Sequence, residues 1–279
     1  MTTTTTRPAH TIGDLLREWR KRRRLSQLEL AAQAAISARH LSFVENGRSL
    51  ASRDIVLRLA GALGLALRER NQLLLAAGYA PVYQETGLES PQMAAVLAMV
   101  RQVLAAHEPF PAVVLDRYWN RVEANGPAWL FSTGVAPHLL QEPVNLMRVA
   151  LHPQGLAPSI ANLGEWRAHL LGRLRRQVAL TADARLGRLY DELLGYPCDQ
   201  PEPDVELPGP GAIAVPLRLR HQGRVLSFFS TVSTFGTPLD ITVAELAIES
   251  FYPADVATTE LLRATAWPQP GAVHPAGGL

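Results

Sequence analysis

The residues best suited to recognition chemistry lie in the segment 25–47, which reads LSQLELAAQAAISARHLSFVENG. Ser26 and Ser37 are of the type that caps helix starts, so the segment predicts two short helices joined by a tight turn. Arg39 then stands near the start of the second helix, on a polar and basic face, and Gly47 ends that helix. A guanidinium placed there can donate two parallel hydrogen bonds to a guanine edge, worth about 1–3 kcal/mol of discrimination. A helix of this kind can enter a DNA major groove with its N-terminus first.

Charge is distributed unevenly along the 279 residues. Residues 1–78 hold 13 basic and 6 acidic side chains, net +7, whereas residues 79–279 are net −5. The basic run KRRRL at 21–25, taken alone, is compatible with a merely solvated face. Together with the paired helices, however, the asymmetry places the predicted nucleic-acid contact in the N-terminal part of the chain.

Other kinds of chemistry find little support in the sequence. The eight histidines are scattered without metal-ligand spacing, and the single cysteine, Cys198, excludes an internal disulfide and a cysteine-based zinc finger. No HExxH, GxSxG or GxxxxGK[ST] motif occurs. We therefore expect no enzyme, no cofactor and no metal site. A Cys198–histidine nucleophile, with its partner distant in sequence, is the enzymatic alternative.

The elements that must position these groups change type along the chain. Residues 11–77 show helical spacing throughout, and prolines and glycines then interrupt the pattern. The remainder mixes helical stripes with alternating strands such as IAVPLRLRH, which is followed by a predicted hairpin turn at Gln222-Gly223. We expect an all-α domain at 10–78, a linker at 79–91, an α+β domain at 92–266 and a disordered tail at 267–279.

Four motifs of the N-terminal part belong together: LSQxELA, the Ile-Ser exit from the turn, ENGR after the second helix, and LRLAGALGL. With this spacing, residues 12–65 resemble the Cro/repressor-type (xenobiotic-response-element) helix-turn-helix domain of five helices. The resemblance implies that the second helix of the motif reads bases and that flanking residues bind phosphates. Carried over by position, the base-reading residues are Ser37, Ala38, Arg39, Ser42 and Phe43, and the phosphate contacts are Gln27, Asn46 and Arg48.

One residue departs from that family. Its members often have glycine in the turn, where this chain has Ala35. If the position requires a positive φ, alanine costs about 1 kcal/mol there. We expect a slightly different turn within the same fold.

The C-terminal part carries weaker motifs. They are ERNQLLLAAGYAP (69–81), PAVVLDRYWNRVEAN (111–125), EPVNLMRVALHP (142–153) and FFSTVSTFGTPLDITVAELAIESFYPAD (228–255). These segments resemble the MmyB-like regulators, which pair a repressor-type helix-turn-helix with a PAS-like ligand-binding domain. The resemblance implies an α+β pocket that takes long-chain fatty-acyl ligands.

A pocket for an acyl chain needs an apolar tube and a polar group at its mouth. For the head group, the candidates are Arg148, with Asn145 three residues before it, and Arg218 with Arg220. Ordinary core packing is the alternative role for most of the aromatic candidates, and a solvated sheet face is the alternative for Arg218 and Arg220. The candidates for the tube are Trp119, Trp129, Phe131, Leu146, Phe228 and Phe229.

The sequence thus predicts a cytoplasmic, homodimeric regulator. We expect it to bind a double-stranded DNA operator and a small apolar ligand, with no membrane contact, since no stretch resembles a signal peptide or a transmembrane helix. Two alternatives remain: a repressor whose C-terminal domain only dimerises, and an enzyme with a DNA-binding appendage.

Overall fold

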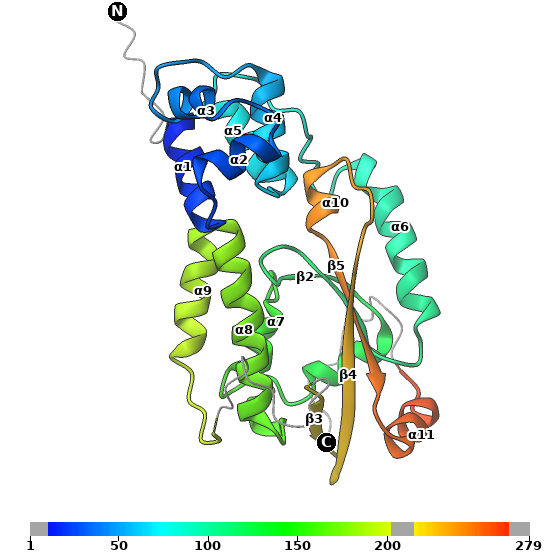
Figure 1. Ribbon diagram of the computed structural model, residues 1–279. Coiled ribbons are helices and arrows are strands. Elements are labelled where there is room, and N and C mark those ends of the chain that lie inside the picture. Colours follow the sequence, from blue (N-terminus) through cyan, green and yellow to red (C-terminus); the bar gives the residue numbers. More distant parts are fainter. Residues whose placement is uncertain (1–10, 202–214, 268–279) are drawn as a thin grey trace, which may run out of the picture. The chain divides into compact units, whose positions relative to one another are not determined.

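A computed structural model describes residues 11–201 and 215–267 (Figure 1). The expected tail therefore lies outside the described residues, apart from Trp267. The chain divides into two compact units. Among the described residues, unit 1 contains 11–86 together with 238–244, and unit 2 contains the rest.

Unit 1 is helical, and Ser26 caps a helix as the sequence predicts. Ser26 accepts a hydrogen bond from the backbone of Glu29, whose carboxylate binds the Ser26 backbone in return, and Thr11 forms the same reciprocal cap with Asp14. These caps satisfy amide groups that the first turn of a helix leaves without partners. The helices are α1 (Ile12–Arg22), α2 (Gln27–Gln33), α3 (Ala38–Glu45), α4 (Arg53–Ala62) and α5 (Leu67–Ala76).

Helices α2 and α3 form the predicted helix-turn-helix. Ala35 in the turn has φ +52°, so the position does require the left-handed conformation that glycine adopts more easily. Gly47 has φ +69° after α3, and the amide of Arg48 reaches back to the carbonyl of Phe43. One apolar core holds the helices together; its largest fully buried members are Leu16, Leu30, Leu41, Leu59, Leu63, Leu73 and Leu74.

Unit 1 is completed by a distant segment of the chain. Asp240 accepts hydrogen bonds from the amide and the hydroxyl of Thr86, at 3.1 and 2.6 Å, and the amide of Ile241 donates to Gln84. The structure therefore differs from the expected sequential division: residues 79–86 of the expected linker belong to unit 1, and so does 238–244. The insertion depends on contacts between residues 154 positions apart, which local patterns do not report.

Unit 2 is built on an antiparallel sheet of five strands in the order β2-β1-β5-β4-β3. The predicted hairpin turn between β3 and β4 is present, with positive φ at Gln222 and Gly223. The segment before the last strand forms a short helix, α10 (Ile241–Glu245), whose residues 241–244 belong to unit 1. The strands are β1 (Ala112–Leu115), β2 (Arg121–Ala124), β3 (Leu217–His221), β4 (Arg224–Thr234) and β5 (Ala247–Pro253).

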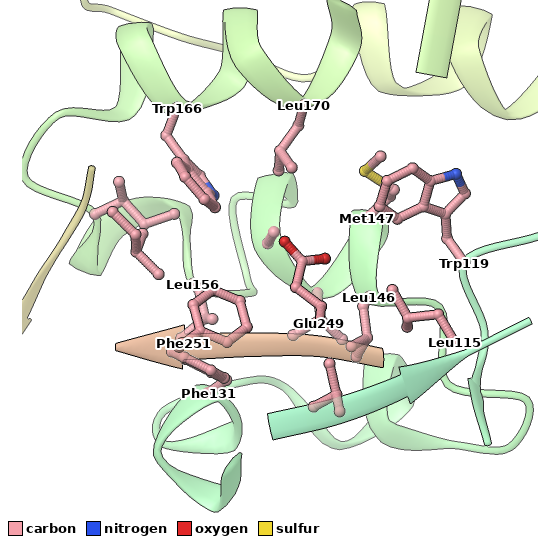
Figure 2. A pocket seen from close by; sticks show the side chains of 15 residues that line it. Leu115, Trp119, Phe131, Leu146, Met147, Leu156, Trp166, Leu170, Glu249 and Phe251 are labelled. Atoms are coloured by element: carbon pink, nitrogen blue, oxygen red, sulfur yellow. The ribbon is translucent and has the colours of Figure 1, made fainter. Parts of the chain in front are cut away.

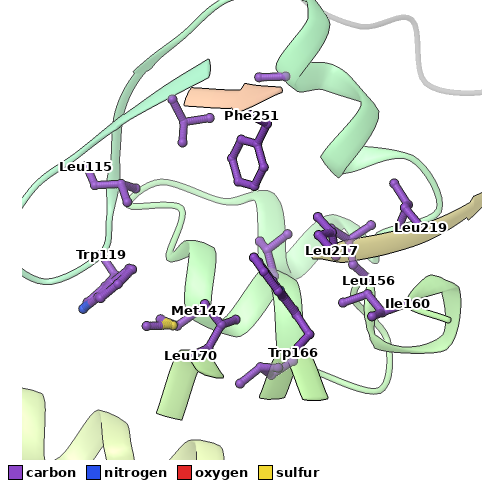
Figure 3. Packing of buried hydrophobic residues seen from close by; sticks show 14 of the residues in the cluster. Leu115, Trp119, Met147, Leu156, Ile160, Trp166, Leu170, Leu217, Leu219 and Phe251 are labelled. Atoms are coloured by element: carbon purple, nitrogen blue, oxygen red, sulfur yellow. The ribbon is translucent and has the colours of Figure 1, made fainter. Parts of the chain in front are cut away.

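Side chains of successive residues in the sheet enter two different apolar clusters. Val113 and Leu115 join the larger cluster, whereas Ala112 and Val114 join a smaller one with Val100 of α6. This alternation is the period of two expected of a strand buried on both faces. The larger cluster, part of which is shown in Figure 3, contains Trp166, Leu170 and Phe251.

The helices of unit 2 pack against the sheet and contribute side chains to the larger apolar cluster. Helices α8 and α9 lie side by side (Figure 1) and contribute Leu174 and Leu186 to the larger cluster. Asn125 accepts a hydrogen bond from the amide of Ala128 and so caps a 3-10 turn. The elements are α6 (Pro91–Ala106), η1 (Gly126–Ser132), η2 (Pro137–Leu140), α7 (Leu146–Leu151), η3 (Ala157–Ser159), α8 (Leu163–Thr181), α9 (Ala184–Leu194) and α11 (Val256–Ala264).

Candidate nucleic-acid interface and ligand pocket

The outward face of α3 carries the residues expected to read bases. Ser37 and Arg39 are exposed, whereas Ala38, Ser42 and Phe43 are half-buried. The Arg39 guanidinium lies 5.3 Å from the centroid of the Phe43 ring, one turn further along the helix. This cation–π contact holds a cation beside an apolar surface, a pairing suited to a guanine edge next to a thymine methyl group.

The end of α3 is anchored through Glu45, whose side chain is 1% exposed. Arg20 of α1 binds both carboxylate oxygens, Nε to Oε1 at 2.7 Å and Nη2 to Oε2 at 2.9 Å. Gln27 donates to Oε2 at 2.7 Å. Burial opposes ionisation of Glu45, but the hydrogen bonds from Arg20 and Gln27 outweigh it, and the pKa of the carboxyl lies below its usual range.

The helices α1 and α3 approach each other closely at this anchor. Arg17 donates to the backbone carbonyl of Glu45 at 2.6 Å. A Cβ added at Gly13 would lie only 2.4 Å from the same carbonyl oxygen. The orientation of α3 is thus fixed by backbone contact as well as by the ion pair.

The three expected phosphate contacts have different surroundings. Asn46 and Arg48 are exposed after α3, and the Asn46 amide lies 3.4 Å from the Ser42 hydroxyl. Gln27 is half-buried, and its amide nitrogen is engaged by Glu45. The structure therefore gives Gln27 a role in fixing α2 against α3, which the sequence did not indicate.

Unit 2 contains an apolar pocket with a cavity of about 70 Å³ (Figure 2). Its walls come from the sheet, from α7 and α8, and from the loops between them. Among the described residues, fourteen of its fifteen lining residues are apolar and the other is Glu249. The apolar ones are Val113, Leu115, Trp119, Phe131, Leu146, Met147, Val149, Ala150, Leu156, Ile160, Trp166, Leu170, Leu217 and Phe251.

One face of helix α8 lines this pocket. Trp166 and Leu170 line it, and Arg173 and Gln177 continue the same face at the spacing of successive helical turns. Next to Trp166, the ring of His169 is stacked with centroids 5.3 Å apart. Burial, together with the nearby charges of Arg173 and Arg176, lowers the pKa of His169 to about 4.

Trp119 has an unusual backbone conformation for a large side chain, with φ +67° in the β1–β2 turn. Its indole nitrogen donates to Gln177 at 2.7 Å, and the Arg173 guanidinium lies 4.7 Å from its ring centroid. Backbone strain of this kind often accompanies functional sites. Here it turns the indole toward α8, at one side of the pocket (Figure 2).

Glu249 on β5 is 5% exposed and projects between Leu170, Leu146 and Phe251 (Figure 2). Its Oε1 accepts hydrogen bonds from Arg173 Nη1 at 2.9 Å and from the Ser230 hydroxyl at 3.0 Å. Sequence reasoning missed both Glu249 and Arg173. The available signal was a charged residue in β5 at the same parity as Ala247 and Phe251, whose side chains are apolar.

The structure brings some of the predicted tube residues together and separates others. Trp119, Phe131 and Leu146 line the pocket. Trp129 lines a different, open hollow beside β2 and is 37% exposed. Phe228 is fully buried and meets Phe131 edge to face, whereas Phe229 is 41% exposed and stacks on Tyr252.

The predicted head-group residues lie outside the apolar pocket. Arg148 forms a two-pronged ion pair with Glu192, at 2.7 Å for each bond, and lines another hollow together with Asn145. The hydrogen bond from Arg148 holds the pKa of Glu192 below its usual range. Asn145 caps α7 by accepting from the amide of Arg148.

Arg218 and Arg220 lie on β3, and neither lines the apolar pocket. Arg218 is exposed, and Arg220 donates to the carbonyl of Ile160 at 3.3 Å. The alternating pattern of β3 turns Leu217 and Leu219 inward instead.

Within 11–201 and 215–267, no group of three or more histidine, cysteine, aspartate or glutamate side chains could hold a metal ion. No helix in these ranges combines the length and the apolar character that crossing a membrane requires.

Comparisons with known proteins match both units. Residues 11–73 match a helix-turn-helix domain family. The restriction-modification controller protein C.AhdI from Aeromonas hydrophila is 36% identical over 21% of this chain and 89% of its own, with a TM-score of 0.21. The curated proteins gave no match.

The C-terminal part matches the MmyB-like transcription regulator ligand binding domain over residues 96–264, more than half of the chain. Both matches are to domains of transcription regulators. With a helix-turn-helix domain before it, the resemblance seen in the sequence is confirmed: the chain belongs to the MmyB-like transcription regulators, DNA-binding proteins with a ligand-binding domain.

Proposed function

We propose that this regulator acts in the cytoplasm as a homodimer whose two α3 helices read an operator. The exposed position of Arg39 beside Phe43 is the observation that carries the base-reading role. Ser37, Ala38 and Ser42 complete the reading surface, and Gln27, Asn46 and Arg48 flank it toward the phosphates. A dimer of such domains binds half-sites about one helical turn apart.

The experiment for this proposal starts from an operator selected from random DNA with the full chain. We expect Arg39→Ala to weaken binding by about 1–3 kcal/mol and to relax the preference at one base pair of each half-site. Arg22→Ala is the matched control, since Arg22 pairs with Glu18 on α1 and lies outside the predicted reading surface. Equal base preferences in wild type and Arg39→Ala would remove Arg39 from the reading surface.

We propose further that unit 2 is a PAS-like sensor and that its apolar pocket takes a small molecule with an acyl chain, of which a fatty acid is the first to test. The apolar lining supports this class of ligand. The cavity is smaller than the engineered cavities of about 150 Å³ that hold benzene. Binding therefore requires lining side chains to move, and Met147 is of the type that adapts most readily.

Sensing requires that the ligand bind one dimer arrangement more tightly than another, because only differential affinity shifts a population. Native mass spectrometry of the full chain tests both parts of this proposal. We expect a dimer mass with an added small molecule that is released on activation. A dimer without any adduct, together with DNA affinity that no acyl compound changes, would support a regulator whose C-terminal unit only dimerises.

A further inference from the structure

The polar group in the described lining of the apolar pocket is a carboxylate. Glu249 is the charged residue among the described lining residues, and it lies at the centre of the apolar wall (Figure 2). The arginines expected to take a ligand carboxylate, Arg148 and Arg218, do not line this cavity. A polar group carried into the pocket would therefore meet Glu249 as its polar partner among the described lining residues.

The two oxygens of Glu249 have different surroundings. Oε1 is held by Arg173 and by Ser230, at 2.9 and 3.0 Å. Within the described parts of the chain, Oε2 has no hydrogen-bond donor. A carboxylate oxygen accepts up to two hydrogen bonds, so Oε2 can accept from a donor in the cavity. The site thus offers a fixed acceptor to whatever occupies the cavity.

The charge of the ligand's polar group determines whether it can donate to Glu249 Oε2 favourably. Arg173 balances the charge of Glu249, so the pair is neutral before any ligand arrives. A ligand carboxylate would meet the like charge of Glu249 and could not donate to Oε2. A ligand ammonium would donate, but it would add an unbalanced buried charge, which a low-dielectric site disfavours.

We propose that the pocket selects a neutral apolar molecule with a hydroxyl group, which donates its proton to Glu249 Oε2. Arg173 and Ser230 are positioning residues that hold the carboxylate through Oε1. Trp119 packs against the Arg173 guanidinium and keeps it in place. This inference rests on the proposed ligand site and narrows it: the pocket prefers a long-chain alcohol to the fatty acid that is the first ligand to test.

Intrinsic tryptophan fluorescence of the full chain provides the test, because Trp119 and Trp166 both line the pocket. The probes are 1-octanol, octanoate and octylamine at neutral pH, which share a chain length and differ in the head group. We expect 1-octanol to bind at least about tenfold more tightly than octanoate or octylamine, a difference of about 1.4 kcal/mol.

The Glu249→Gln variant distinguishes recognition from a structural role. Its amide oxygen can still accept from Arg173 and Ser230, which turns the amide nitrogen, a donor, toward the cavity. We expect the preference for 1-octanol over octanoate to fall by about tenfold or more, whereas a merely structural role would weaken both ligands equally. Glu142→Gln, at an exposed pair with Arg121, is the matched control.

The outcomes separate the two proposals. If none of the three probes changed the tryptophan fluorescence, the proposed ligand site would be overturned. Binding of octanoate as tight as that of 1-octanol to the wild-type chain would overturn the hydroxyl inference and leave the ligand site standing. This second comparison needs no variant, so it holds even if Glu249→Gln fails to fold.

Discussion

A buried arginine–glutamate pair in each unit, Arg20–Glu45 in unit 1 and Arg173–Glu249 in unit 2, invites comparison, because the two differ in how completely their carboxylates are hydrogen-bonded. In unit 1, both oxygens of Glu45 are occupied by Arg20 and Gln27. In unit 2, Arg173 and Ser230 both bind the same oxygen of Glu249. The side chains are similarly buried, at 1% exposure for Glu45 and 6% for Glu249.

This difference separates a structural pair from one available for recognition. Buried polar groups normally have their hydrogen bonds made, as those of Glu45 are. A carboxylate that faces a cavity with one oxygen available gives up stability that a fully bonded or apolar group would provide. The two pairs therefore predict opposite responses to substitution.

The largest effect is expected for Glu45→Ala. It leaves Arg20 without its carboxylate and removes the link between α1, α2 and α3. We expect the free energy of unfolding of unit 1 to fall by about 3–5 kcal/mol. Hydrogen exchange of peptides from residues 12–62 of the full chain measures this loss separately from unit 2.

Glu18→Ala provides the control for that measurement. Glu18 pairs with Arg22 one turn apart on α1, with about half of its side chain exposed, and such pairs contribute about 0.3–0.5 kcal/mol. If Glu45→Ala lowers protection no more than Glu18→Ala does, the Glu45 anchor contributes nothing special.

A smaller effect is expected from adding one methyl group near each pair. Gly13→Ala would drive a Cβ into the Glu45 carbonyl, so we expect unit 1 to lose about 1–3 kcal/mol. Gly172→Ala, beside Arg173 on α8, meets no atom closer than 3.6 Å and should stabilise the helix by about 0.5–1 kcal/mol. Thermal unfolding of both variants tests this. If both variants changed the midpoint temperature equally, the two sites would be packed alike.

On acidification, the two units should begin to lose stability at different pH values. The folded pKa of His169, about 4, lies below its ordinary value of 6.5, so the unfolded chain takes up the proton first. Unit 2 therefore loses this contribution as pH falls from about 6.5 to 4. Glu45 also has a lowered pKa, and unit 1 loses its contribution only as pH falls below the ordinary glutamate value of 4.5.

Hydrogen exchange at a series of pH values, corrected for the intrinsic rate, would follow both units in one sample. We expect His169→Gln to flatten the response of unit 2 above pH 4.5 and to leave unit 1 unchanged. A response of unit 2 that is the same with and without His169 would contradict the assignment.

The smallest loss of stability is expected when Arg173 and Glu249 are both replaced by apolar residues. Arg173→Met combined with Glu249→Leu fills the cavity wall with apolar atoms, and such replacements are often neutral or stabilising. We expect unit 2 to keep or gain stability and to lose its preference for 1-octanol. The corresponding change in unit 1, Arg20→Met with Glu45→Leu, should be destabilising because Gln27 and the α3 end lose their partner.

Local patterns predicted unit 1 well because its signals lie close together in sequence. The caps at Ser26 and Ser37, the positive φ at Ala35 and the stop at Gly47 each depend on a few neighbouring residues. The pocket depends on distant partners instead: Arg173 meets Glu249 across 76 positions. Polarity and spacing near Arg148 suggested a head-group site, but its ion pair with Glu192 could not be read from the sequence.

The segment 238–244 has a consequence for how the protein is made. Its Asp240 binds Thr86, 154 positions earlier in the chain. At about 5–20 residues per second, translation needs about 8–30 s to cover that distance. During this interval the helices of unit 1 have left the ribosome, while the segment that completes the unit has not yet been synthesised. The DNA-binding unit therefore reaches its finished form only after the ligand-binding unit is almost entirely translated.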